Sequence, residues 1–346
     1  MTLGGPFVAT AVTAVLNFAH APGLAVFIAG GFALAGLAWT IGVATEAVGT
    51  QFGPAATGFL QSTLANLPEL FIVIFALRAG EVVVAQTTIL GSIFANALLV
   101  LGLAIVAGAW VAPDGVMRFH RKLPNDTAVL LMLAVFIIVL LGLSHTVGDR
   151  ASEHEVTISA IGAVLLLTVY IVWLLGYLRP QGKWEPAHVE QARPEIPLKP
   201  ALFLLAGSAV SAAFVSEWFV HAIEPTVETL GISRPFIGIV IVAIAGNAVE
   251  NVVGIMLAAK GKSDLAISVI KNSVAQIAVF LFPVLVLVSL LLPNQVTFVL
   301  EPVYIGALVL MALAIWQVTY DGEAAAYEGW SLVALFLILA VLVWFK

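Results

Sequence analysis

The sequence predicts an all-α membrane protein of eleven transmembrane helices, and three observations support that prediction. Hydrophobic residues fill 62% of the 346 positions and charged residues only 10%, whereas an average soluble domain has roughly 25% charged residues. Eleven apolar runs are long enough to cross a bilayer. The two-residue alternation of membrane β-barrels is absent. Such runs in lipid form helices, because a helix satisfies its own backbone hydrogen bonds.

Each run is close to the roughly 20 apolar residues that one helix needs to cross the hydrocarbon layer. In chain order the runs cover residues 3–19, 24–45, 54–77, 84–111, 127–147, 157–178, 200–220, 235–258, 265–292, 296–317 and 329–345. Because their number is odd, the two ends of the chain are expected on opposite sides of the membrane.

Lysine and arginine are unevenly distributed between the loops. Nine of the fourteen lie in loops on the N-terminal side, four lie on the opposite side, and Lys271 lies inside a run. Since cytoplasmic loops are enriched in these residues, we expect a multi-pass protein of a prokaryotic inner membrane with a cytoplasmic N-terminus. The first residues carry no positive charge, so a cleaved signal peptide is not expected.

Charge and cysteine content exclude several classes of protein. The net charge of −6 leaves no basic surface, so a nucleic-acid partner is not expected. The absence of cysteine excludes disulfides and thiolate metal sites. We expect the protein to lie in a lipid bilayer. The sequence does not decide the oligomeric state, and a homo-oligomer is possible.

One motif occurs twice. Asn66 and Glu69 in the third run match Asn247 and Glu250 in the eighth, at a spacing of 181 residues. The next run carries an amide in both copies, with hydroxyls beside it. These residues are Ser92 and Asn96 in the first copy and Ser273 and Gln276 in the second.

The two copies are five runs apart, so the second crosses the membrane in the opposite sense. The predicted organisation is an N-terminal helix (1–22), a first five-helix repeat (23–179), a cytoplasmic linker (180–199) and a second, inverted repeat (200–346). Inverted repeats that meet near the bilayer midplane are typical of secondary transporters.

Glu69 and Glu250 lie near the middle of apolar runs, where a charge costs roughly 2.5–3.5 kcal/mol on insertion scales. Asn66 and Asn247, three residues earlier, share a helix face with them. If the two helices cross, two carboxylates and two amide oxygens meet. We therefore expect these four residues to be the metal ligands, with Asn96, Gln276, Ser92 and Ser273 supplying further oxygens.

An oxygen-only ligand set suits a hard cation such as calcium, which takes 6–8 oxygens. All six histidines lie in loops or at the ends of runs, which disfavours zinc and copper. Pro68 and Gly246 interrupt the two helices and can free backbone carbonyls for the ion. Two bare carboxylates repel each other in a low dielectric. Either one divalent cation or two protons would neutralise the pair, so we expect obligatory exchange of one for the other. Cations and protons are then the transported partners, and no cofactor is expected.

These motifs resemble the calcium/proton exchanger (CAX) family of the calcium/cation antiporter superfamily, over nearly the whole chain. Besides the two glutamate motifs, the residues that carry the resemblance are Ala44-Thr45-Glu46, Phe52-Gly53-Pro54, Leu90 to Asn96, Val215-Ser216-Glu217, Asp321-Gly322 and Glu328-Gly329-Trp330. The resemblance implies one N-terminal helix, two inverted five-helix halves, alternating access around a central cation site, and export of calcium driven by inward proton flow.

The chain departs from the family pattern at several positions. In the first motif, Ala65 and Pro68 replace the Gly and Thr that are usual in the family. In the second repeat, Lys271-Asn272-Ser273 replaces a Gly-Ser-Ser pattern. Lys271 is expected either to extend toward the loop that holds Lys260 and Lys262 or to titrate against the glutamates and modulate the site. If Lys271 modulates the site, the transported cation could instead be sodium, potassium or manganese.

Glu46 and Glu217 are expected to line the two vestibules or to be ordinary interfacial charges. Two other functions are weaker alternatives. An intramembrane hydrolase would need paired aspartates or a serine with a base, which the runs do not offer. A channel lined by carboxylates fits the inverted repeat less well than an exchanger does.

Overall fold

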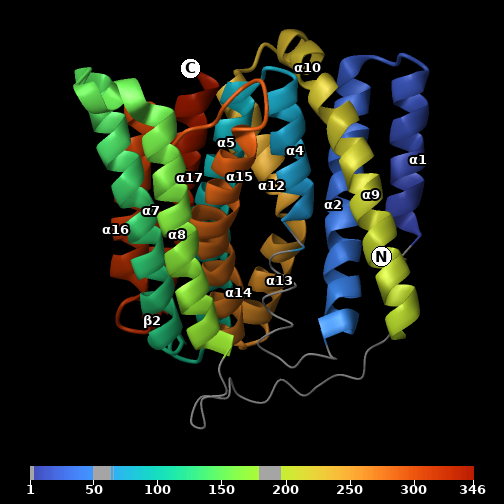
Figure 1. Ribbon diagram of the computed structural model, residues 1–346. Coiled ribbons are helices and arrows are strands. Elements are labelled where there is room, and N and C mark those ends of the chain that lie inside the picture. Colours follow the sequence, from blue (N-terminus) through green and yellow to red (C-terminus); the bar gives the residue numbers. More distant parts are fainter. Residues whose placement is uncertain (1–3, 50–63, 65, 179–195) are drawn as a thin grey trace.

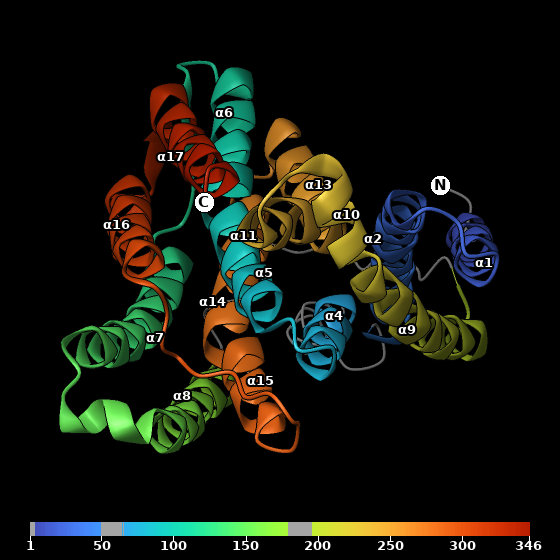
Figure 2. The ribbon, with the colours of Figure 1, turned by 90° about the horizontal axis from the view of Figure 1, so that it is seen from above.

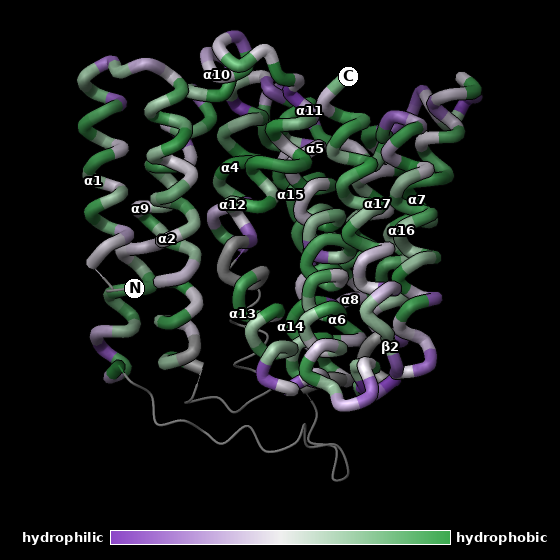
Figure 3. The backbone as a smooth tube through the Cα atoms, turned by 180° about the vertical axis from the view of Figure 1, so that it is seen from behind, coloured by the Kyte–Doolittle hydropathy of each residue, from purple (hydrophilic) through white to green (hydrophobic). Residues whose placement is uncertain are grey.

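The computed structural model describes residues 4–49, 64, 66–178 and 196–346. The helices stand side by side in one bundle (Figure 1). Within the described residues, eight helices are long and apolar enough to cross a membrane, or nine if one bent pair counts as a span. Hydrophobic residues dominate along the helices and hydrophilic ones gather near both ends (Figure 3). The prediction of an all-α membrane protein is therefore confirmed.

The first half of the chain forms α1 (Gly5–Phe18), α2 (Gly23–Gly49), α4 (Leu67–Arg78), α5 (Val82–Phe94), the π-helical η1 (Ala95–Val100), α6 (Leu101–Val111), β1 (Val116–Arg118), α7 (Lys122–Val147), the 3₁₀-helical η2 (Arg150–His154) and α8 (Glu155–Leu178). The second half forms α9 (Leu198–His221), α10 (Ile223–Leu230), α11 (Arg234–Phe236), the π-helical η3 (Ile237–Val242), α12 (Ala243–Gly246), α13 (Ala248–Ala259), α14 (Ser263–Gln276), the π-helical η4 (Ile277–Leu281), α15 (Phe282–Ser289), α16 (Pro302–Thr319), β2 (Glu323–Ala325) and α17 (Ala326–Trp344).

Three of the predicted spans are not single long helices among the described residues. The run 3–19 forms α1, which has only 14 residues. The run 235–258 is interrupted at Asn247 (φ −96°, ψ 13°), between α12 and α13. The first part of the run 54–77, with the Phe52-Gly53-Pro54 turn, lies outside the described residues, as does most of the linker 180–199.

Helix boundaries recur at one spacing in the two halves. Leu67 and Ala248, which begin α4 and α13, are 181 positions apart, and both helices have 12 residues. Val82 and Ser263, which begin α5 and α14, have the same spacing. Both α5 and α14 then lead into a π-helical segment, η1 and η4. The repeated sequence motif thus coincides with a repeated pattern of helix breaks.

Seen along the helix axes, α1, α2 and α9 form a group on one side of the bundle (Figure 2). Phe27 of α2 stacks on Phe219 of α9 with ring centroids 4.4 Å apart. The helix α4 lies between α9 and the remaining helices, which include α5 and α14 (Figure 2). This position places the first motif at the boundary between the two groups.

At one end of the bundle, a short antiparallel sheet joins the segment after α6 to the segment before α17. β1 pairs with β2 in a register that sets Val116 opposite Ala325 and Arg118 opposite Glu323. Arg118 also pairs with Asp114 at 2.6 Å, which holds the pKa of that exposed carboxyl below its usual range. The helix α10 and the C-terminal end of α17 lie at the opposite edge (Figure 1).

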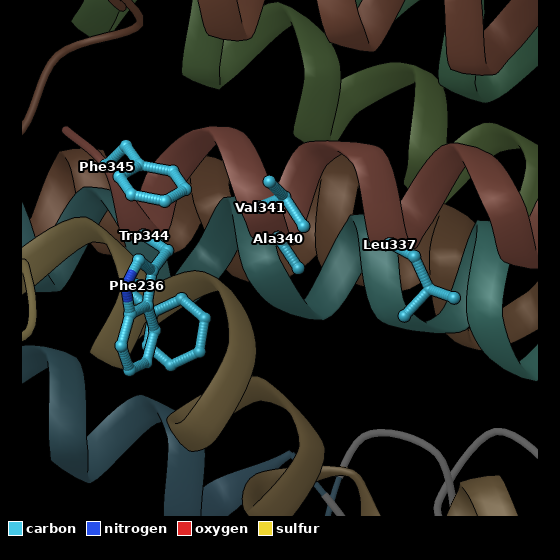
Figure 4. A pocket seen from close by; sticks show the side chains of 6 residues that line it. All are labelled: Phe236, Leu337, Ala340, Val341, Trp344 and Phe345. Carbon is cyan, nitrogen blue, oxygen red and sulfur yellow. The ribbon is translucent and has the colours of Figure 1, made fainter.

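An apolar groove runs beside the end of α17 (Figure 4). Its lining residues are Phe236, Leu337, Ala340, Val341, Trp344 and Phe345. The ring of Trp344 meets that of Phe236 edge-on, with centroids 4.8 Å apart. Because the groove has no charged or amide side chain in its lining, it offers no ligands to a cation.

Candidate cation-binding site

Both acidic motifs begin a helix inside the bundle. Asn66 (φ −82°, ψ 1°) is the residue before α4, and Glu69 lies in the first turn of that helix. Pro68 occupies one of the first two positions, where a missing N–H group removes no helical hydrogen bond. Asn247 and Glu250 occupy the same positions relative to α13. A carboxylate is favoured here because the N-terminal end of a helix carries partial positive charge.

The side chain of Glu69 is buried, with 2% of its surface exposed. Its Oε1 atom accepts hydrogen bonds from the Ser92 hydroxyl and from Asn247 Nδ2. The same Asn247 nitrogen lies 2.9 Å from Ser92 Oγ and 2.9 Å from the carbonyl oxygen of Ala243. A buried carboxylate held by charge-assisted hydrogen bonds is far less costly than a bare one.

Asn96 extends this cluster to η1 and α14. Its Nδ2 atom donates to Asn247 Oδ1 and to Ser273 Oγ, both at 3.1 Å. Asn96 and Ser273 are each 1% exposed. The network therefore joins α4, α5 and η1 from the first half of the chain to α13 and α14 from the second.

Glycines allow the backbones to approach closely around the cluster. A Cβ atom on Gly246 would lie 3.1 Å from both Cγ and Oε1 of Glu69. A Cβ atom on Gly91, one residue before Ser92, would lie 2.5 Å from Cα of Ile239 in η3. Gly91 leaves no room for a side chain, so the α5–η3 crossing depends on glycine, whereas a methyl group at position 246 would force Glu69 to shift by a few tenths of an ångström.

The structure brings five of the predicted residues into one hydrogen-bonded network: Glu69, Ser92, Asn96, Asn247 and Ser273. Asn66 is buried beside them at the start of α4. Gln276 is also buried, one turn after Ser273 on α14, but within the described part of the chain its Oε1 atom has no hydrogen-bond partner. The backbone of Glu250 lies in the first turn of α13, and its side chain is outside the described residues.

Lys271 does not reach the solvent, because only 3% of its surface is exposed. Its ammonium group donates to Thr319 Oγ1, 3.4 Å away at the end of α16, and the Thr319 hydroxyl donates to the carbonyl of Ile315. The ammonium group therefore ends inside the helix bundle beside Thr319 and does not emerge at the protein surface.

The two expected vestibule residues lie toward opposite ends of neighbouring helices. Glu217 is half-buried, four residues before the end of α9. Glu46 lies near the end of α2, with its side chain outside the described residues. The neighbouring Ser216 is buried, and its hydroxyl lies 3.5 Å from the carbonyl oxygen of Pro68. The sequence does not predict this contact, although Ser216 belongs to the Val215-Ser216-Glu217 motif that carries the family resemblance.

Carboxylate, amide and hydroxyl oxygens gathered at one buried point are suited to a hard cation. Within the described residues, no group of three His, Cys, Asp or Glu side chains could hold a metal ion. The described cluster contributes one carboxylate, and the backbone places Glu250 at the equivalent position of α13. A site with two carboxylates at this point would therefore need both helix starts.

Sequence comparison places the chain among known transporters. Residues 22–178 and 200–345 match the family described as sodium/calcium exchanger protein. The Ca²⁺/H⁺ antiporter ChaA of Bacillus subtilis is 30% identical over 328 residues, covering 93% of this chain and 92% of the relative. A Ca²⁺/H⁺ antiporter of Synechocystis is 31% identical over 338 residues, covering 92% and 91%.

Solved structures share the fold. The structure of native YfkE superposes with a TM-score of 0.82 at 27% identity, covering 99% of this chain and all of the other. A crystal structure of the H⁺/Ca²⁺ exchanger CAX, at 15% identity and a TM-score of 0.75, covers 98% of this chain and 89% of the other, and shows the shared fold alone. With a family match over both halves and relatives at 30% identity or more, the chain belongs to the sodium/calcium exchanger family of membrane transporters.

Proposed function

We propose that this protein is a secondary antiporter that exchanges Ca²⁺ for H⁺ across the membrane. The observation that carries the proposal is the buried carboxylate of Glu69, which lies in the first turn of α4 and is held by Asn247 from the other half of the chain. Relatives that match more than nine-tenths of the chain are named Ca²⁺/H⁺ antiporters. Membership of a transporter family excludes the intramembrane hydrolase.

The exchange follows from the charge of the site. Glu69 and Glu250 together form a dianion in a low-dielectric interior when neither is protonated, and such a site is strongly disfavoured. One Ca²⁺ neutralises the pair, and so do two protons. The loaded forms therefore cross between inward-facing and outward-facing states, while the empty form does not. Ca²⁺ and H⁺ take turns at the same oxygens, and no cofactor is needed.

The ligands in this proposal are Glu69, Glu250, Asn66 and Asn247, with Asn96, Gln276, Ser92 and Ser273 as further oxygen donors. Asn247 has a second task, because its amide nitrogen fixes Oε1 of Glu69 while its amide oxygen accepts from Asn96. Glu46 and Glu217 then attract cations into the two vestibules from opposite ends of α2 and α9.

The proposal includes an arrangement of eleven spans: an N-terminal helix and two inverted five-helix halves that alternate access to the site. The equal spacing of the breaks before α4 and α13 supports it, and so do the π-helical segments that follow α5 and α14. The excess of Lys and Arg in the loops on the N-terminal side supports a cytoplasmic N-terminus in a bacterial inner membrane.

Purified protein in proteoliposomes with an imposed pH gradient tests the function. We expect Ca²⁺ added on one side of the membrane to drive protons across it in the opposite direction, at a rate that saturates with calcium concentration. Mn²⁺, Na⁺ and K⁺ are expected to drive much less proton movement. Proton movement with Na⁺ or K⁺ but not with Ca²⁺ would contradict calcium exchange. Flux that does not saturate and needs no counter-ion would indicate a channel.

A further inference from the structure

Two buried polar side chains lie side by side next to the network, and each has an oxygen atom with unused hydrogen-bonding capacity. The Tyr170 hydroxyl of α8 lies beside the Gln276 side chain of α14. Tyr170 is 1% exposed and Gln276 is 4% exposed. Within the described residues, neither the Tyr170 hydroxyl nor Gln276 Oε1 has a hydrogen-bond partner. Leaving a buried donor or acceptor unpaired is costly, so this pair has an unused capacity for bonding.

Packing fixes the position of Tyr170. Its ring lies 5.4 Å from that of Phe280 in η4, one turn after Gln276, and 5.8 Å from that of Trp173. The π-helical segment η4 begins directly after Gln276, and such segments occur frequently at functional sites. The phenol is thus held against the part of α14 that carries the amide.

Gln276 shares a face of α14 with Ser273, three residues earlier, and Ser273 accepts a hydrogen bond from Asn96. Asn96 of the first half lies one position beyond the residue that corresponds to Gln276, and it bonds across to Asn247. Gln276 makes no such bond through its oxygen in this structure. The Asn96 amide is therefore engaged in the network, whereas the Gln276 oxygen is not.

We propose that Tyr170 is a positioning residue that lets the Gln276 amide turn between two orientations. A carboxamide presents an acceptor at one end and donors at the other, and a phenol both donates and accepts. When the Tyr170 hydroxyl donates to Oε1, the Nε2 group faces the network and suits a bare carboxylate. When Nε2 donates to the Tyr170 oxygen, Oε1 faces the network and can bind the cation.

In both orientations the end of the amide that faces Tyr170 is hydrogen-bonded to the phenol, so rotating the amide costs no hydrogen bond there. Phenylalanine at position 170 fills the same space but pairs with neither end. The carbonyl of Gln276 is then no longer held toward the ion, and affinity falls. This inference rests on the proposed function, since it assigns a role in cation binding at the same site.

The test compares Tyr170→Phe with Tyr304→Phe in calcium-driven proton flux from proteoliposomes. Tyr304 of α16 is a matched control, because it is also buried and its hydroxyl also lacks a hydrogen bond within the described residues. We expect Y170F to raise the calcium concentration for half-maximal flux about fivefold, as for one lost buried hydrogen bond, with little change in maximal flux. Y304F is expected to match the wild type.

A double-mutant cycle separates positioning from packing. If Tyr170 acts through the amide, Y170F adds nothing to the effect of Gln276→Leu. Additive effects, or a Y170F variant that binds calcium like the wild type, would overturn the proposal, and so would a Y170F protein that cannot be recovered folded. Wild-type protein without calcium-driven proton flux would instead overturn the proposed function itself.

Discussion

Asn247, the residue before α13, donates a hydrogen bond to Glu69 in the first turn of α4, 178 positions earlier in the chain. The bond joins the starts of α4 and α13 inside the bundle. Because Ser92 of the first half and Asn247 of the second both donate to Glu69, the two halves of the chain hold this carboxylate together. The hydrogen-bond network is a property of the interface between the halves.

Asn247 is expected to matter more than Asn96. Asn247→Ala removes the donor to the Glu69 carboxylate, and hydrogen bonds to charged groups contribute about 1.5–3 kcal/mol. We expect calcium affinity to fall about 10-fold to 100-fold, measured as the calcium concentration for half-maximal proton flux. Asn96→Ala removes bonds between neutral groups and is expected to lower affinity about 2-fold to 10-fold. Equal effects, or a larger one for Asn96, would contradict this ordering.

A methyl group at position 246 should disturb the carboxylate directly. The Cβ atom of Gly246→Ala would lie 3.1 Å from Oε1 and Cγ of Glu69, so the glutamate must move by a few tenths of an ångström. We expect a several-fold loss of calcium affinity in the same flux assay. Gly306→Ala on α16 is the control, because its Cβ would meet no atom within 4 Å. A G246A protein that binds calcium as tightly as G306A would show that Glu69 is not confined there.

Lys271→Met tests whether the buried lysine modulates the site. Since its ammonium group donates to Thr319 at the end of α16, we expect the order of preference among Ca²⁺, Mn²⁺ and Na⁺ to stay unchanged. Methionine has a similar length and no charge to desolvate, so the midpoint of thermal unfolding is expected to hold or rise. Lys260→Met, at an exposed position, controls for loss of one positive charge. A changed cation preference in K271M alone would restore the modulating role.

Packing between α6 and α17 should be sensitive to a single methyl group. A Cβ atom on Gly329 would lie 2.5 Å from the carbonyl oxygen of Gly102, and one on Gly102 would lie 2.6 Å from that of Gly329. We expect Gly329→Ala to lower the free energy of unfolding by about 1–3 kcal/mol, detected as a lower unfolding midpoint in detergent. Gly176→Ala, which meets nothing within 4 Å, is expected to leave the midpoint unchanged. Equal midpoints for the two variants would show that these helices can separate freely.

Much of the fold and of the polar network can be predicted from the sequence, because apolar runs and repeated motifs are directly visible in it. Long apolar runs require helices, and an Asn–Glu spacing of three repeated after 181 residues places equivalent side chains on equivalent faces. The motifs thereby predict that Glu69, Asn247 and Asn96 lie near one another, and the structure brings them into contact. The resemblance to calcium/proton exchangers is likewise confirmed by relatives that match nearly the whole chain.

Other features depend on tertiary contacts that leave little trace in the sequence. A tyrosine at position 170 in an apolar run gives no indication that it faces Gln276, and a lysine at position 271 does not reveal Thr319 as its partner. The break at Asn247 has a local hint in Gly246, but glycine in a membrane helix more often serves packing. The π-helical segments have no residue pattern that distinguishes them from α-helix.

The central claim is that a buried pair of glutamates must be discharged by either calcium or protons, and calcium-driven proton flux in proteoliposomes tests it most directly. Glu69→Gln and Glu250→Gln each remove one of the two charges, and we expect both to reduce exchange to the level of protein-free vesicles. Glu153→Gln, at an exposed position of η2, is expected to exchange like the wild type. Wild-type flux in Glu69→Gln or Glu250→Gln protein would contradict the claim.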